Sequence, residues 1–126
     1  SDNKDTNCIL CSFTHLIAVS AFLKESLRFA REDGVDNIEV QKRIQACAEE
    51  IVAMERFDLS IENIQNSPQE EQLLAKTVLP QVRKLRQNIA SINSVEDIEN
   101  SIVLVSDLAK SVREQMLSKN KPPPED

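Results

Sequence analysis

The 126-residue chain contains a single glycine, Gly34, and this scarcity excludes several classes of nucleotide-binding protein. Loops that cradle phosphate groups need several glycines, because their backbone N–H groups must come close to the anion. Neither the P-loop nor the dinucleotide-binding fingerprint can be written with one glycine. The tight turns of β-hairpins also favour glycine, so the composition argues against a mostly β fold.

Aromatic residues and positive charge are also scarce. The chain has four Phe, no Trp and no Tyr, and its formal net charge is −6. Stacking on nucleic-acid bases and caging of a quaternary ammonium group both need aromatic rings. Nucleic-acid binders usually carry a basic excess or a dense basic stripe. We therefore expect neither a nucleic-acid partner nor a bound cofactor.

Long hydrophobic runs are missing too. The longest apolar run, residues 15–23, is too short to span a bilayer, so we expect no membrane span. A signal peptide over residues 8–23 is a weak alternative. The segment before it should be positively charged, but it carries one lysine, Lys4, and two aspartates. The three cysteines are odd in number and lack the spacing of a disulfide scaffold. Such a set is typical of a reducing compartment, and we expect a cytoplasmic location.

Apolar residues recur at helical spacing in four segments, and this periodicity is the main positive signal. Start and stop signals support it: Gly34 suits the left-handed position after a helix, and Asp36 or Asn37 can cap the next helix. Residues 67–70, Ser-Pro-Gln-Glu, form a capping box with proline in the first helical position. The predicted helices are residues 6–33, 37–57, 67–92 and 94–119.

The predicted fold is an all-α, antiparallel up-down-up-down four-helix bundle over residues 1–119, with a kink at Pro80. A break at Leu79 is the alternative to the kink. Residues 120–126 contain three prolines and predict a disordered tail or linker. The predicted core faces of the last three helices are Val40, Ile44, Cys47, Ile51 and Met54, then Leu74, Val78, Val82, Leu85, Ile89 and Ile92, then Ile98, Ile102, Val105, Ala109, Val112 and Met116.

Two cysteines and the only histidine lie on one face of the first helix and raise the question of a metal site. Cys8 and His15 are separated by about 10.5 Å along the helix axis, so they cannot share one zinc ion. Cys11, His15 and Cys47 would still lack a fourth ligand. We therefore predict no metal site and interpret the three cysteines as small buried hydrophobic residues.

His15 also invites a catalytic interpretation, because some helical bundles carry a phosphorylated histidine. That chemistry favours an exposed imidazole with cationic help, and no Lys or Arg follows until Lys24. Nucleophilic catalysis needs an orienting carboxylate, and nothing nearby in the sequence supplies one. The chain is therefore predicted not to be an enzyme, and phosphotransfer at His15 is kept as an alternative function.

The surplus of apolar surface suggests where a function lies. The apolar arc of the first helix covers roughly 220°, whereas a bundle helix needs about 100° or somewhat more. This helix is either enclosed by its neighbours or offers a groove to a partner. Leu10 and Ile17 lie outside even this arc, and Val103 and Leu104 lie off the core face of the fourth helix.

The predicted function is a non-enzymatic protein–protein interaction module, a scaffold or adaptor that docks an amphipathic helix or another bundle. The candidate contact residues are apolar, with a basic cluster at the rim for an acidic motif. An apolar-ligand carrier is a further alternative, and a homo-oligomer is possible. The candidates are Leu10, Ile17, Val103, Leu104, Lys76, Arg83, Lys84 and Arg86.

Overall fold

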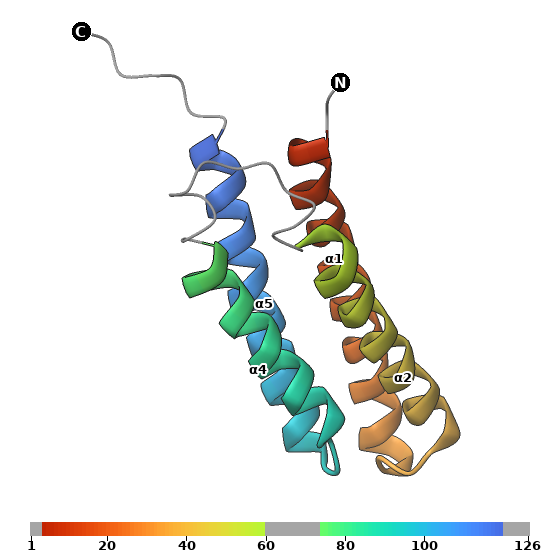
Figure 1. Cartoon of the computed structure of the whole chain (residues 1–126). Coiled ribbons are helices and arrows are strands. Elements are labelled where there is room, and N and C mark those ends of the chain that lie inside the picture. Colours follow the sequence, from red (N-terminus) through yellow and green to blue (C-terminus); the bar gives the residue numbers. More distant parts are fainter. Residues whose placement is uncertain (1–3, 60–73, 120–126) are drawn as a thin grey trace, which may run out of the picture.

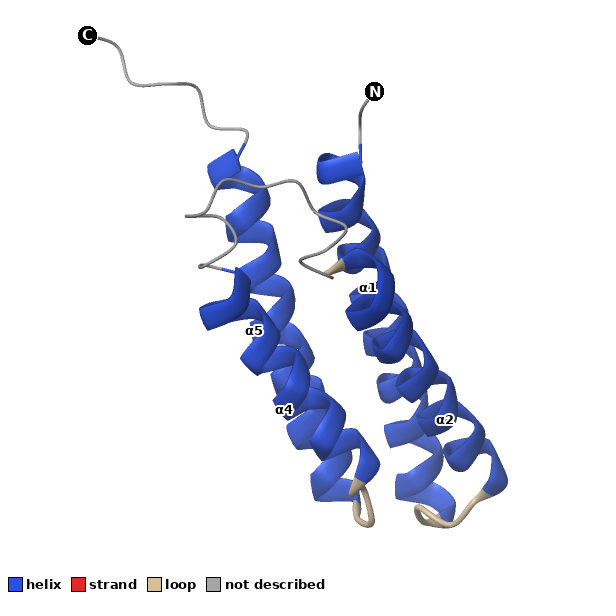
Figure 2. Ribbon diagram, in the orientation of Figure 1, coloured by secondary structure: helices blue, strands red, loops and turns tan. Residues whose placement is uncertain are grey.

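The computed structural model describes residues 4–59 and 74–119, which are helical apart from short turns (Figures 1 and 2). No strand occurs within these two ranges, so the predicted all-α class is confirmed. Two short π-helical turns, η1 and η2, border the gap between the ranges. The elements are α1 (Lys4–Asp33), α2 (Ile38–Ala53), η1 (Met54–Asp58), η2 (Leu74–Val78), α4 (Leu79–Ala90) and α5 (Val95–Lys119).

The helix contacts form a ring of four. Helix α1 packs against α2 and α5, and α4 packs against α5 and α2. Figure 1 shows α1 beside α2 and α4 beside α5, with both short turns at the same end. This arrangement is the predicted four-helix bundle. The up-down-up-down order of helix directions and the kink at Pro80 stay predictions.

The turn between α1 and α2 forms as its sequence predicts. Gly34 has a φ of 88°, and its N–H donates to the Ala30 carbonyl at 2.8 Å. A left-handed residue there closes the end of α1 without the steric cost of a Cβ atom. The Asn37 side chain accepts the Glu39 N–H at 2.7 Å and so caps α2.

A reciprocal pair of hydrogen bonds forms the turn between α4 and α5. The Ser94 hydroxyl accepts the Asp97 N–H at 3.2 Å, which caps the start of α5. The Asp97 carboxylate in turn accepts the Asn93 N–H at 2.9 Å. Short capped turns at one end therefore hold the two helix pairs α1–α2 and α4–α5.

The helix geometry changes at the position where the sequence predicted a kink or a break. Residues 74–78 are π-helical, and the α-helical pattern begins at Leu79, with Pro80 in its first turn. Proline has no N–H to donate to the preceding turn, so a change of hydrogen-bond pattern there is expected. The predicted capping box at 67–70 and the tail at 120–126 lie outside the described residues.

The core draws on all four helices and follows the predicted faces closely. Val40, Cys47, Ile51 and Met54 of the second predicted face are buried. So are Val78, Val82, Leu85 and Ile89 of the third face, and Ile98, Val105 and Val112 of the fourth. On α1 the buried line is Ser12, Leu16, Val19, Leu23, Ser26 and Ala30.

The prediction missed two buried residues of α5. Leu108 is fully buried, although it was not assigned to the core face. Ser101 is also fully buried; its hydroxyl donates to the Asp97 carbonyl at 2.9 Å and accepts from the Asn88 side chain at 2.6 Å. A polar side chain is invisible to hydrophobic periodicity, so its burial is found only when its partner on α4 is known.

Candidate docking groove

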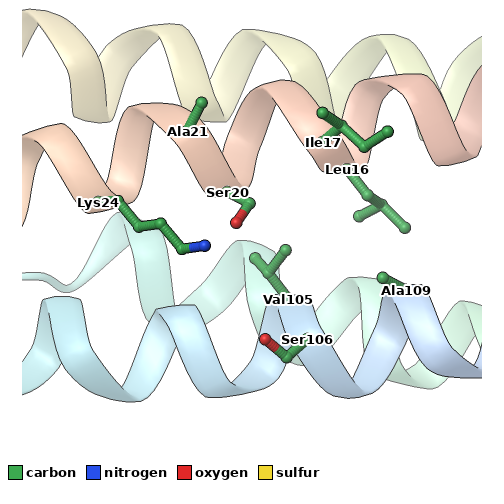
Figure 3. A pocket seen from close by; sticks show the side chains of 8 residues that line it. All are labelled: Leu16, Ile17, Ser20, Ala21, Lys24, Val105, Ser106 and Ala109. Carbon is green, nitrogen blue, oxygen red and sulfur yellow. The ribbon is translucent and has the colours of Figure 1, made fainter.

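A surface groove runs between α1 and α5. It has a volume of about 370 Å³. Figure 3 shows Leu16, Ser20 and Lys24 of α1 extending toward α5, and Val105 and Ala109 of α5 extending toward α1. We call this feature the α1–α5 groove. Its lining is Leu16, Ile17, Ser20, Ala21, Lys24, Val105, Ser106 and Ala109.

The groove exists because small residues occupy the edge where the two helices meet. The lining includes the small residues Ser20 and Ala21 of α1 and Ser106 and Ala109 of α5, and none of these side chains is long enough to fill the gap. Leu16 and Val105 are only 1% and 2% exposed, so they form an apolar floor that belongs to the core. The hollow is therefore fixed by packed helices and not by a loop.

Ile17 lies on the wall of this groove with 58% of its surface exposed. Exposed isoleucine beside an apolar floor is the arrangement that a partner helix would cover. Of the two explanations for the wide apolar arc of α1, its contacts with α2 and α5 fit enclosure, and the groove for a partner stays a prediction. Helix α1 is enclosed by α2 and α5, and Ile17 lies beyond that enclosure.

Positive charge lines one end of the groove and lies one helical turn beyond its lining at the other. Lys24 lines one end, and Arg113 follows Ala109 by one turn of α5 at the other. Both residues are exposed, and neither forms an ion pair with another residue in the described ranges. Their charges are therefore available to an anionic group of a partner.

The other apolar candidates do not join Ile17. Val103 is 57% exposed on α5 but does not line the α1–α5 groove. Leu104 is half-buried against the core and lines a different hollow, between α4 and α5. Leu10 lies in α1, but its side chain is outside the described set. The structure therefore does not join Ile17, Val103 and Leu104 in one continuous strip.

The predicted basic cluster is spread over different surroundings. Lys84 lines the α4–α5 hollow with Leu104, whereas Arg86 forms an ion pair with Glu55 at 3.5 Å. Lys76 and Arg83 are exposed. Asp107 and Glu114 also line the α4–α5 hollow, so its charge is mixed and gives no clear preference for an acidic motif.

His15 has a carboxylate partner that the sequence analysis did not find. Its Nδ1 lies 3.2 Å from Glu50 Oε2, and the two side chains are 26% and 30% exposed. The sequence analysis considered only carboxylates close to His15 in the sequence, whereas Glu50 comes from α2, 35 positions away. A carboxylate at Nδ1 orients the ring but repels a phosphoryl group at that atom. The contact links α1 to α2.

The cysteines also differ from their prediction. Cys47 is buried, and its thiol lies 3.7 Å from the Val19 carbonyl oxygen, to which it donates. Burial, with a smaller contribution from the nearby Glu50 charge, raises the pKa of Cys47 to about 12. Cys11 is exposed, so its assignment as a buried residue was wrong. In the described part of the chain, no three or more His, Cys, Asp or Glu side chains cluster to hold a metal.

The groove itself could not be read from the sequence, although one of its residues could. Ile17 stood out because it lies off the core face of α1. Ser20, Ala21 and Ser106 carried no signal, since small residues are common on helix surfaces, and Ala109 was assigned to the core face. They form a groove only because the two helices, more than eighty positions apart, pack side by side.

Comparison of the chain with protein-family models, with curated proteins and with solved structures found no significant match. Of the helices that the structure describes, none combines the length and apolar character needed to cross a bilayer.

Proposed function

We propose that this four-helix bundle is a non-enzymatic protein–protein interaction module, a scaffold or adaptor that docks an amphipathic helix in the α1–α5 groove. The observation that carries the proposal is exposed Ile17 beside the apolar floor of Leu16 and Val105. Burying such a surface against apolar side chains of a partner is favourable, at about 25 cal/mol per Å² of apolar area.

The dimensions of the groove suit a short helix. Leu16 and Lys24 are eight residues apart, so the groove is about 12 Å long, or slightly more than two helical turns. A helix presents apolar side chains at i, i+3 or i+4, and i+7 over that length. The small side chains at the edge of the groove leave room for large apolar residues from the partner.

The charges define the partner further. Lys24 and Arg113 flank the two ends, so the best ligand is an amphipathic helix with an acidic residue near each end of its apolar stripe. The free thiols of Cys11 and Cys47 are compatible with a reducing environment, and we place the proposed interaction in the cytoplasm.

The alternative functions have weaker support. A carrier would hold its apolar ligand in an enclosed cavity, whereas the α1–α5 groove includes exposed residues such as Ile17 and Lys24. Phosphotransfer at His15 would put a phosphoryl group near the Glu50 carboxylate, which disfavours it electrostatically. We therefore assign no chemistry to His15.

The experiment selects helical peptides from a displayed library against the folded domain and measures their affinity by calorimetry. Ile17→Asp should weaken binding at least tenfold, because it adds a charge to the apolar wall. Val103→Asp is the matched control, since Val103 is equally exposed but lies outside the groove. Lys24→Glu should shift the selected sequences from acidic to basic flanks.

The result that contradicts the proposal is equally specific. Selected peptides that bind the Ile17→Asp and Val103→Asp variants with the same affinity would show that the α1–α5 groove is not the docking site. Thermal unfolding of both variants establishes that each remains folded. Because both side chains are exposed, we expect their stabilities to differ from that of the wild type by less than about 1 kcal/mol.

A further inference from the structure

A second exposed surface, with an apolar side chain at each end, lies on α2. Among the described residues four large hydrophobic side chains are exposed, and two of them, Ile38 at 64% and Val52 at 47%, lie on this helix. Gln45 lies midway, seven residues from each, and is also exposed. Seven residues make nearly two full turns, so the three side chains follow one line along the helix.

A hollow lies at one end of this line. It has a volume of about 330 Å³, and the small residues Ala48 and Ala53 leave space beside Val52. Its lining also includes Gln45, Glu49 and Arg56. Ile38, the most exposed of the large hydrophobic side chains, lies at the opposite end of the same line. The two ends are therefore unlike each other: one projects an isoleucine, and the other has a recess.

Charges of opposite sign lie beside this line, one on each side of Gln45 along the helix axis. Lys42 lies three residues before Gln45 and Glu49 four residues after it, both on the same flank of α2. Lys42 has only a long, exposed contact of 3.8 Å with Glu39, and Glu49 forms no ion pair within the described ranges. The two charges stand about 4.5 and 6 Å from the midpoint along the axis.

We propose that this surface, the α2 outer face (Ile38, Lys42, Gln45, Glu49 and Val52), binds the same face of a second copy of the chain. The two α2 helices lie antiparallel about a twofold axis at Gln45. Such an axis brings Ile38 of each copy to the Val52 recess of the other, and Lys42 of each copy to Glu49 of the other. Each contact forms twice, as an isologous interface requires.

This self-complementarity indicates that the partner of the α2 outer face is a second copy of the chain. A face that is apolar at both ends, carries a glutamine in the middle and has opposite charges at nearly equal distances from it fits its own antiparallel copy. The interface is one helix wide, smaller than the roughly 800 Å² per partner of a stable complex. We therefore expect a concentration-dependent dimer with a dissociation constant of about 10 µM to 1 mM.

Disulfide trapping tests the geometry. In a Cys8→Ser, Cys11→Ser background, Gln45→Cys lies at the twofold axis and should cross-link to its own copy. Val52→Cys is the matched control, because its symmetry mate lies about 21 Å away along the axis, beyond the reach of a disulfide. The initial rate of dimer formation should be at least tenfold higher for Gln45→Cys. Equal rates for the two variants overturn the proposal.

A charge exchange tests the pairing. Lys42→Glu or Glu49→Lys alone should weaken dimerisation in sedimentation equilibrium at least threefold, because like charges then meet across the axis. The double variant should restore the wild-type dissociation constant, because opposite charges meet again. Lys84→Glu makes the same charge change on α4 and should leave the dimer dissociation constant unaltered. A wild-type chain that stays monomeric at about 1 mM, or a double variant that restores nothing, overturns the proposal.

This inference does not depend on the α1–α5 groove. Ile17→Asp should leave the dimer dissociation constant unchanged, since Ile17 lies on α1, at the edge of the α1–α5 groove and not on α2. Circular dichroism of each variant establishes that the helices persist, so a loss of dimer is a loss of contact. Peptide binding without dimerisation would therefore count against the α2 outer face alone. Dimerisation without peptide binding would count against the α1–α5 groove alone.

Discussion

Replacing Leu23 with alanine should destabilise the bundle far more than replacing Ile17, although both are large aliphatic residues of the same helix. Leu23 is 0% exposed and belongs to the core, whereas Ile17 is 58% exposed. Helix α1 is so apolar that its sequence does not separate these roles. The comparison therefore tests whether the structure assigns the inner and outer faces of α1 correctly.

The expected magnitudes follow from burial. Leu23→Ala removes about three buried carbon groups at about 0.8 kcal/mol each and leaves a cavity, so it should lower the free energy of unfolding by about 3 kcal/mol. For a chain of this size that is a drop in melting temperature of about 11 °C. Ile17→Ala exposes little new surface and leaves no enclosed cavity, so we expect a loss below about 1 kcal/mol.

Urea unfolding followed by far-ultraviolet circular dichroism is the suitable assay. The chain has neither Trp nor Tyr, so intrinsic fluorescence gives little signal, whereas the helical signal is strong. Equal slopes of free energy against urea establish that both variants unfold as the wild type does. Similar losses for both variants, or a larger loss for Ile17→Ala, would refute the assignment of the two faces.

Further predictions concern polar groups in and near the core. With the pKa of Cys47 raised to about 12 from an ordinary value near 9, the folded state keeps a proton that the unfolded chain releases. The free energy of unfolding should therefore fall as pH rises from about 9 to 12, by up to about 1.4 kcal/mol per pH unit, and Cys47→Ala should remove this part of the slope. In a Cys8→Ser variant, a thiol reagent should modify the exposed Cys11 in the folded protein and Cys47 only upon unfolding; equal rates would contradict the burial of Cys47. Asn88→Ala should cost about 1–2 kcal/mol in thermal unfolding because it removes a 2.6 Å hydrogen bond to buried Ser101, and a neutral result would show that this contact does not form.

The helices of this protein are predictable because local signals agree with one another. Of the two predicted caps of α2, Asp36 and Asn37, a hydrogen bond shows Asn37 in use, and a positive φ at Gly34 confirms the predicted end of α1. Periodicity identified the buried faces, since residues such as Ile51 and Leu85 recur at helical spacing. These features depend on neighbours in sequence, so one sequence is enough to find them.

The features that sequence analysis missed depend on contacts between helices. The pairing of His15 with Glu50 joins α1 to α2, and the burial of Ser101 depends on Asn88 of α4. Cys11 was assigned to the interior because free cysteines are commonly buried, but its place on α1 leaves it exposed. The direction in which each helix faces its neighbours is a property of packing, which periodicity does not supply.

The most direct test of the docking groove is amide chemical-shift mapping of the isotope-labelled domain during titration with a helical peptide selected from the library. The account predicts that the largest shifts fall in residues 16–24 of α1 and 105–109 of α5, with α2 little changed. Largest shifts on α2 or on the α4–α5 hollow, with residues 16–24 unchanged, would contradict it.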